Sequence, residues 1–202
     1  MSDAPTPEPA PDKAGLRRTA RAARTAFVAG LDPMAHRLAF RAVPSPIRGL
    51  LADCRCIALY APLDDEAPAL RLAEALIAEG KSLCLPRVID RMGTMEFRAW
   101  APGAPLEPGR FGTVHPPVSE PVRHPDAILA PLVAFDARLM RLGQGGGYYD
   151  RAFARYDSAL RIGLAWSVQQ IDAVPAEPWD VPLHRVMTER SVIAPDETGP
   201  VA

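Results

Sequence analysis

The segment from Arg141 to Arg151 contains the residue types expected of an anion-binding loop. Four of the five residues from 143 to 147 are glycines, whose backbone can turn successive N–H groups toward one point. An apolar run of strand length, 127–135, precedes the loop, and a segment of helical composition, 148–156, follows it. The loop therefore lies at the start of a helix, where the helix dipole favours a negative ligand such as phosphate.

Two common nucleotide motifs do not fit these glycines. The P-loop spacing Gly-x-x-x-x-Gly-Lys-Ser/Thr is absent, and the dinucleotide pattern Gly-x-Gly-x-x-Gly with a distant acid does not match. Glycines alone are also compatible with a flexible turn. The flanking residues favour a nucleotide triphosphate, because they add a cation, Arg141, and a carboxylate able to hold magnesium, Asp150.

A cationic helix is predicted near the N-terminus, from Lys13 to Ala29, with Asp12 as its N-cap. Its cations recur at a spacing that places them on one face: Lys13, Arg17, Arg21 and Arg24. Such a face is also typical of a solvated surface. The functional interpretation is that Lys13 and Arg17, one turn apart, clamp the phosphates of a nucleotide.

The chain between these two elements predicts the sheet that positions them. A strand at 56–60, a helix at 67–78 and a strand at 82–85 form a βαβ unit, so a parallel sheet is expected. Ligands bind such sheets at the carboxyl ends of the strands. The residues that follow predicted strands, and are expected around one crevice, are Tyr60, Glu66, Arg87 and the glycine loop.

The predicted fold class is α/β, with a three-layer, Rossmann-like, mostly parallel sheet and helices on both of its faces. One domain is expected at 13–194, between a disordered N-terminal tail at 1–12 and a C-terminal tail at 195–202. The other expected elements are a helix from Pro33 to the Pro44-Ser45-Pro46 breaker with a short continuation after it, an antiparallel strand at 94–100, a core strand at 161–166, a helix from 168 and an edge strand at 186–188.

Composition argues against several classes of function. The formal net charge is −1 and no cationic block occurs, which disfavours a nucleic-acid surface. No apolar window reaches the length of a membrane span or a signal peptide. Cys54, Cys56 and Cys84 lack the second pair that a zinc site requires and are interpreted as reduced core thiols, so a cytoplasmic location is expected.

A proline-rich connection at 101–125 is predicted to be an irregular, functional loop. Within it, Phe111 has two interpretations. Its ring either packs on the core and anchors the loop, or is exposed and available to a ligand.

Most of the chain, roughly 13–189, resembles the 5-formyltetrahydrofolate cyclo-ligases, also called methenyltetrahydrofolate synthetases. The central motif is Phe135-Asp136 together with the segment from Arg141 to Arg151. Supporting matches occur in the family's order: Lys13-x-x-Leu16-Arg17, Tyr60-x-Pro62 with Glu66, Pro86-Arg87, Gln169, Asp180-x-Pro182 and Thr188-Glu189.

The resemblance implies ATP-dependent closure of 5-formyltetrahydrofolate to 5,10-methenyltetrahydrofolate, with magnesium and with release of ADP and phosphate. It also implies a fold like that of the ribose-phosphate isomerase and CoA-transferase group. The protein is expected to act as a monomer on a small-molecule substrate, without nucleic acid or membrane.

The resemblance further implies roles for individual residues. Lys13, Arg141 and Tyr149 would be catalytic, Asp150 would hold magnesium, and Glu66, Tyr60, Tyr149 and Phe111 would bind the folate. The residues implied to bind ATP are Lys13, Arg17, Arg141, Leu142, Gly143, Gln144, Gly145, Gly146, Gly147, Tyr148 and Tyr149.

Three positions depart from the family pattern. Leu139 replaces a glycine, so the turn before Arg141 must either avoid positive φ or bear strain. His184 stands where an aspartate is common, which puts a second metal ligand in question, and His115 stands where an acid is common.

Three functional hypotheses are compatible with the sequence. The leading one is the cyclo-ligase. The second is a folate- or nucleotide-binding regulator on the same fold without turnover, suggested by Leu139 and His184. The third is a sugar-phosphate isomerase or acyl-CoA transferase, for which Glu66 is the candidate base or nucleophile.

Overall fold

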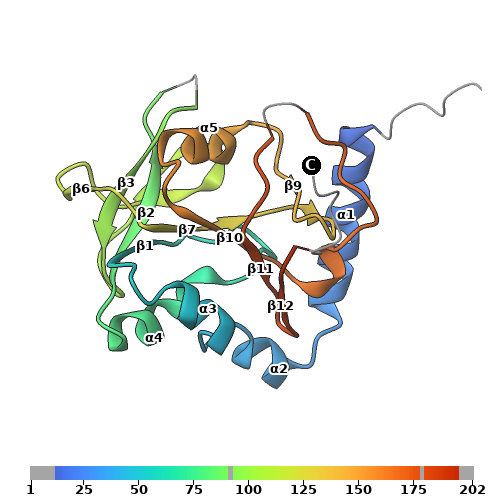
Figure 1. Ribbon diagram of the computed structural model, residues 1–202, viewed down its shortest axis with the longest axis horizontal. Coiled ribbons are helices and arrows are strands. Elements are labelled where there is room, and N and C mark those ends of the chain that lie inside the picture. Colours follow the sequence, from blue (N-terminus) through green and yellow to red (C-terminus); the bar gives the residue numbers. More distant parts are fainter. Residues whose placement is uncertain (1–11, 91–92, 178–179, 196–202) are drawn as a thin grey trace, which may run out of the picture.

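The computed structural model describes residues 12–90, 93–177 and 180–195. The tails expected at 1–11 and 196–202 lie outside these ranges. Within them, eight strands form one sheet, in which five central strands are parallel and the outer ones antiparallel (Figure 1). In spatial order the strands are β12 (Val192–Ile193), β11 (Arg185–Met187), β10 (Leu160–Leu164), β7 (Ala127–Pro131), β1 (Cys56–Ala58), β2 (Ser82–Val88), β3 (Met95–Trp100) and β6 (Val122–Arg123). The predicted α/β class is confirmed as a mixed, mostly parallel sheet with helices.

Helices lie on both sides of this sheet, α5 on one side and α2, α3 and α4 on the other (Figure 1). The α-helices are α1 (Lys13–Ala29), α2 (Pro33–Leu38), α3 (Ser45–Leu50), α4 (Ala73–Ala78) and α5 (Tyr148–Arg155). Short 3-10 helices are η1 (Ala69–Leu72), η2 (Arg110–Gly112) and η3 (Ser167–Gln169), and two further strand pairs are β4 (Glu107–Pro108) with β5 (Val114–His115) and β8 (Ala134–Phe135) with β9 (Arg141–Leu142).

Side-chain alternation along the strands divides the core between the two faces. On one face, Ile57 packs in a cluster with Ile47 of α3 and Leu76 of α4. On the other face, Ala58 packs in a cluster with Phe153 of α5. Each face therefore buries its own apolar layer, which is why the parallel strands read as continuous hydrophobic runs.

The strand order reverses direction between β1 and β7, which are neighbours in the sheet. From β1 the chain moves outward to β2, whereas from β7 it moves the other way to β10 and β11. Segments that leave the carboxyl ends of β1 and β7 therefore diverge and leave a crevice between them, the position at which open α/β sheets bind ligands.

Several expected elements differ in extent. The predicted strand at 127–135 is interrupted after Pro131, and Ala134–Phe135 pairs instead with β9. The helix expected from Pro33 to the Pro44-Ser45-Pro46 breaker ends earlier, at Leu38, and Phe40 adopts a φ of 59° just after it. The short continuation expected at the breaker is α3. The helix expected from 168 is only the one-turn η3, and the strand predicted as an edge is internal, since β12 pairs outside it.

Other predictions about the chain are confirmed. β3 pairs antiparallel with β2, and the three cysteines are buried free thiols, with Cys56 Sγ 3.7 Å from Cys84 Sγ. Among helices in the described ranges, none combines the length and hydropathy that a bilayer crossing requires.

Candidate active site

A cleft of about 860 Å³ opens at the carboxyl ends of β1 and β7. Its walls come from α1, the segment after β1, the end of β2, the hairpin around η2, and the glycine loop with the start of α5. Every residue predicted to bind ATP, folate or magnesium lines this cleft. Arg87, which was expected there too, does not, because its side chain pairs with Glu96 on β3 at 3.1 Å.

The glycine loop enters α5 through left-handed backbone at two positions. Gly145 has a φ of 104° and Gly147, the N-cap of α5, has a φ of 65°. A Cβ atom at Gly145 would also lie 3.4 Å from Cζ of Arg17. None of the described side chains caps α5, so its first N–H groups are left for water or an anion, as the sequence predicts.

Arg141 is the most enclosed cation of the loop, with only 5% of its side chain exposed. Its Nη2 donates to Oδ1 of Asp150, and its guanidinium lies 5.6 Å from the ring centroids of Tyr149 and Phe153. Nε of Arg141 has no partner among the described residues. The cation and the carboxylate predicted for phosphate and magnesium thus form a pair with each other.

The four cations that the spacing places on one face of α1 line the cleft, which favours the functional interpretation of that face, whereas the neighbouring Arg18 lies outside the cleft. Lys13 Nζ lies 3.2 Å from Oδ2 of Asp180 and 3.5 Å from Oε2 of Glu177. Arg17 Nε donates to the carbonyl oxygen of Gly143 at 2.8 Å. The first helix is therefore fixed directly to the glycine loop, which the spacing of its cations alone does not predict.

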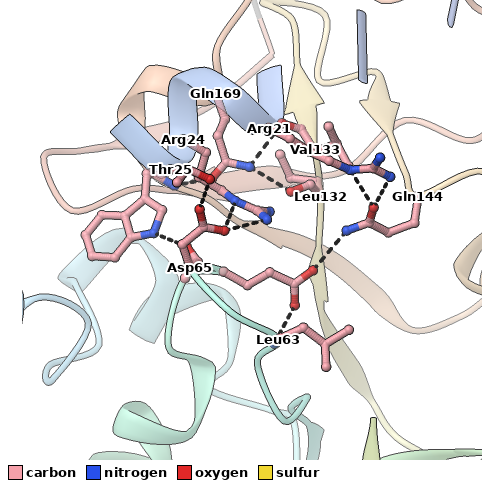
Figure 2. Close-up of polar contacts among 12 residues, drawn as sticks. Arg21, Arg24, Thr25, Leu63, Asp65, Leu132, Val133, Gln144 and Gln169 are labelled. Atoms are coloured by element: carbon pink, nitrogen blue, oxygen red, sulfur yellow. Dashed lines mark hydrogen bonds and ion pairs between the residues drawn. The ribbon is translucent and has the colours of Figure 1, made fainter. Parts of the chain in front are cut away.

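The loop after β1 is held to α1 by a buried ion pair, shown in Figure 2. Arg24 Nε donates to Oδ1 of Asp65 at 2.7 Å, and their side chains are 7% and 15% exposed. Thr25 also donates to Asp65, whose backbone carbonyl accepts from Nε1 of Trp166 at 2.9 Å. The sequence places Arg24 on the cationic face of the first helix but gives no sign of its pairing with Asp65, which follows another aspartate.

Glu66 lies under the cleft with 7% of its surface exposed. Its Oε2 accepts from the N–H of Leu63 at 3.1 Å and its Oε1 from Nε2 of Gln144 at 3.2 Å. Burial raises the pKa of Glu66, and the Leu63 N–H, the charge of Arg24 and the Gln144 amide oppose that rise. Two hydrogen bonds therefore hold the carboxylate in place at the wall of the cleft, and its surroundings only partly offset the effect of burial on its charge.

The aromatic residues predicted to bind folate have different surroundings. Tyr60 is buried and its hydroxyl donates to the carbonyl of Ala67 at 2.7 Å, so only its ring faces the cleft. Burial, followed by the charge of Glu66, raises the pKa of Tyr149. Phe111 is 73% exposed and lies edge-on to Tyr148 at 6.0 Å, so its interpretation as a packed loop anchor is wrong.

The structure shows the surroundings of Leu139 and His184, two of the residues that depart from the family pattern. Leu139 has a φ of 60° and a fully buried side chain, so the turn bears strain. His184 is not among the cleft residues: its Nδ1 accepts from the N–H of Arg161 at 2.9 Å, and its Nε2 lies 3.2 Å from Nη2 of the same arginine. Both ring nitrogens are engaged, which leaves His184 no lone pair for a metal in this arrangement.

Comparison with known proteins agrees with this geometry. The chain matches the model of the 5-formyltetrahydrofolate cyclo-ligase family over residues 10–189. It is 34% identical over 138 residues to the 5-formyltetrahydrofolate cyclo-ligase of Haemophilus influenzae, spanning 65% of this chain and 74% of that protein. It is 32% identical over 144 residues to the enzyme of the same name from Escherichia coli strain K12, spanning 67% and 79%.

A solved structure gives the same result. The 5,10-methenyltetrahydrofolate synthetase of Aquifex aeolicus aligns with a TM-score of 0.72 and 28% sequence identity, covering 94% of this chain and 96% of that chain. The family match spans α1, the segment after β1 and the glycine loop, the elements that form the cleft. The chain therefore belongs to the 5-formyltetrahydrofolate cyclo-ligase family.

Proposed function

We propose that this protein converts 5-formyltetrahydrofolate and ATP to 5,10-methenyltetrahydrofolate, ADP and phosphate. The observation that supports the proposal is the cleft itself, which gathers all the residues that the resemblance implies to bind ATP, folate or magnesium from separate parts of the chain. The isomerase and transferase hypotheses rested on Glu66 acting as a base or nucleophile, whereas the family match over residues 10–189 favours the cyclo-ligase.

The chemistry explains why a nucleotide triphosphate is needed. A formamide carbon is a poor electrophile and its oxygen a poor leaving group. Transfer of the terminal phosphoryl group to the formyl oxygen forms an O–P bond and breaks the bond to ADP. Nitrogen 10 of the folate then attacks the activated carbon, and phosphate leaves as the ring closes. Catalysis of such a transfer depends mainly on positioning and on neutralising charge.

The phosphate side of the cleft is assigned to α1 and the glycine loop. Lys13 and Arg17 would face the phosphates, and the N–H groups from Gly143 to Tyr149 would bind their oxygens. Arg141, 5% exposed and paired with Asp150, would neutralise the transferred charge when that pair opens toward the ligand. Arg141 and Lys13 are thus the charged residues proposed to be catalytic.

Magnesium would be held by Asp150 together with the phosphates. In the described residues, no group of three or more His, Cys, Asp or Glu side chains is arranged to hold a metal ion. A single carboxylate fits Mg²⁺, which is commonly bound by one or two carboxylates and substrate phosphates. When bound, the ion would offset the negative charge of the phosphates. Asp150 has its second oxygen, Oδ2, for this purpose, since Oδ1 accepts from Arg141.

The folate side is assigned to Glu66, Tyr149, Tyr60 and Phe111. The Glu66 carboxylate can accept N–H groups of the pterin, and its burial makes such bonds stronger than in water. The Tyr149 and Tyr60 rings would border the pterin. Phe111, exposed on the hairpin that overhangs the cleft, would cover its outer face.

The test is formation of the methenyltetrahydrofolate chromophore. Product should appear only with 5-formyltetrahydrofolate, ATP and magnesium together, with one ADP for each product. Tight folate binding without ATP hydrolysis would instead identify the non-catalytic regulator. No chromophore with all three components present would reject the cyclo-ligase.

Three finer attributes belong to the same proposal. The fold would fall in the three-layer group that contains ribose-phosphate isomerases and CoA-transferases, because helices flank a mostly parallel sheet on both faces. The protein would act as a monomer, since the motif residues of the cleft all come from one chain. A cytoplasmic location remains the expectation from its free cysteines.

A further inference from the structure

The side chain of Gln144 joins two parts of the cleft that are distant in the sequence (Figure 2). Its Oε1 accepts from Nε of Arg21 at 3.1 Å, and Nη2 of Arg21 donates to the same oxygen. Its Nε2 donates to Oε1 of Glu66 at 3.2 Å. A chain of hydrogen bonds thus runs from α1, through the glycine loop, to the buried carboxylate.

The two neighbours of Gln144 determine how its amide is oriented. A guanidinium can only donate and a carboxylate can only accept, so the amide oxygen must face Arg21 and the amide nitrogen must face Glu66. A glutamate at this position could not donate to Glu66, and a lysine or arginine could not accept from Arg21. Among side chains of this length, glutamine is the one that satisfies both neighbours.

The backbone and the carboxylate of Glu66 are held by different groups, so the bond from Gln144 is required to orient the carboxylate. The backbone of its loop is held at the preceding residue, Asp65, which contacts Arg24 and Trp166. The carboxylate is fixed by the Leu63 N–H on Oε2 and by Gln144 on Oε1. Each oxygen keeps a lone pair for a ligand, so the two bonds set the plane in which Glu66 accepts from one.

We infer that Gln144 is a positioning residue that orients the Glu66 carboxylate for the folate and couples it to the phosphate-binding loop. The inference rests on the proposed function, in which Glu66 contacts the folate and residues 143–147 contact the phosphates. Because the backbone of Gln144 lies between Gly143 and Gly145, a ligand that orders the loop also orders the amide on Glu66. Nucleotide binding should therefore raise the affinity for folate, and folate binding should raise the affinity for the nucleotide by the same factor.

The experiment measures folate affinity directly, by calorimetry on the full chain. 5-Formyltetrahydrofolate is titrated into the wild type and the Gln144→Met variant, each with and without magnesium and a non-hydrolysable ATP analogue. In Gln144→Met we expect about tenfold weaker folate binding, because one hydrogen bond to a buried carboxylate is lost. The loss of folate affinity should exceed any loss of affinity for the analogue alone, since Met keeps the backbone N–H groups assigned to the phosphates. The rise in folate affinity caused by the analogue should disappear.

Two further variants separate positioning from general damage. Gln144→Glu should weaken folate binding more than Gln144→Met, because it places a second carboxylate against Glu66. Gln170→Glu adds the same charge at an exposed position outside the cleft and should bind both ligands as the wild type does. Arg21→Met should show a smaller loss than Gln144→Met, and the double variant should be no worse than Gln144→Met alone.

The pH dependence gives an independent readout. Folate binding should weaken as pH falls through the raised pKa of Glu66, because the protonated acid loses acceptor capacity. Without the Gln144 amide, which lowers that pKa, the loss should begin at a higher pH. The groups facing Glu66 that stay unchanged are Arg24, Asp65, Tyr60, Tyr149 and the Leu63 N–H.

The outcomes distinguish the inference from the proposed function. Wild-type folate affinity in Gln144→Met, with turnover intact, overturns the positioning role alone. The expected loss of affinity in a protein that shows no turnover rejects the cyclo-ligase activity and supports the positioning role. A wild type that binds no folate overturns both. If Gln144→Met melts well below the wild type, the Arg21→Met result decides, since Arg21 lies on the exposed end of the bridge.

Discussion

At Leu139, backbone strain and side-chain burial make opposing contributions to the stability of the fold. Its φ of 60° is left-handed, which costs an ordinary residue about 1–2 kcal/mol. Its side chain is fully buried, which is worth about 1.5–3 kcal/mol for a leucine. Asp136 holds the turn in this shape, because Oδ1 accepts from the N–H groups of Arg138 and Met140 at 3.0 and 3.1 Å. The strain is therefore retained in exchange for a filled core.

Replacing Leu139 by glycine tests that balance. Glycine relieves the left-handed strain but removes the buried side chain and adds freedom to the unfolded chain, so Leu139→Gly should lower the free energy of unfolding by about 1–3 kcal/mol. Urea denaturation measures the change. Asp64→Gly is the matched control, since Asp64 also has positive φ, 45°, but an exposed side chain. That variant should be neutral or stabilising, and a stabilised Leu139→Gly would contradict the balance.

Among the helices and strands, the sequence predicts those whose position is determined by hydrophobic periodicity and by helix-breaking residues. The βαβ unit, the antiparallel β3 and the helix Lys13–Ala29 follow from apolar spacing and from the Asp12 cap. The division of 127–135 into β7 and β8 does not, because a continuous apolar run carries no sign of which strand it pairs with. Likewise, the Phe40 backbone that separates α2 from α3 depends on burial in the core cluster.

The candidate site was predictable to a similar degree. The motif residues of the glycine loop and α1 were found because their types and spacing are unusual. Their pairing was not, because contacts such as Arg141 with Asp150, or Lys13 with Asp180, depend on how the elements dock. The contacts of Arg24 with Asp65 and of Gln144 with Glu66 were not predicted for the same reason, although both Arg24 and Gln144 were singled out.

The docking of α1 should depend strongly on Arg24. Removing one partner of a buried ion pair leaves a buried, uncompensated charge, so Arg24→Met should lower the free energy of unfolding by about 3 kcal/mol. Arg48→Met is the control, because the Arg48 to Glu79 pair is exposed, and such a pair contributes about 0–1 kcal/mol. Thermal denaturation of both variants gives the comparison, and equal losses would show that the Arg24 pair does not fix α1.

The glycine loop should be sensitive to any side chain at Gly145. Alanine there must adopt a φ of 104° and place its Cβ 3.4 Å from Arg17, so the loop should shift and the KM for ATP should rise about tenfold or more. Gly80→Ala is the control, since Gly80 also has positive φ, 79°, but open space around it and no place in the cleft. Gly80→Ala should lose stability yet keep the wild-type KM for ATP. An unchanged KM in Gly145→Ala would remove the loop from the ATP site.

For the whole molecule, the cleft draws on segments from the first helix to Asp180. A ligand in the cleft would therefore lie against α1, the strand ends, Glu177 and Asp180 at once. Lys13, at the start of α1, forms ion pairs with Glu177 and Asp180, which lie between η3 and β11. A phosphate that approaches Lys13 competes with these carboxylates, which should make nucleotide affinity sensitive to ionic strength.

Ligand-induced stabilisation tests this arrangement on the intact protein. ATP with magnesium at about 100 times its Kd should stabilise the fold by about 2.7 kcal/mol, which corresponds to a rise in Tm of about 5–10 °C for a chain of this size. Lys13→Ala should show a smaller rise at the same ATP concentration, and excess ATP should restore it, because the lysine contributes affinity and the backbone amides remain. AMP, which lacks the β- and γ-phosphates, should produce little shift in either protein. A Lys13→Ala protein whose Tm responds to ATP as the wild type does would place the phosphates away from α1.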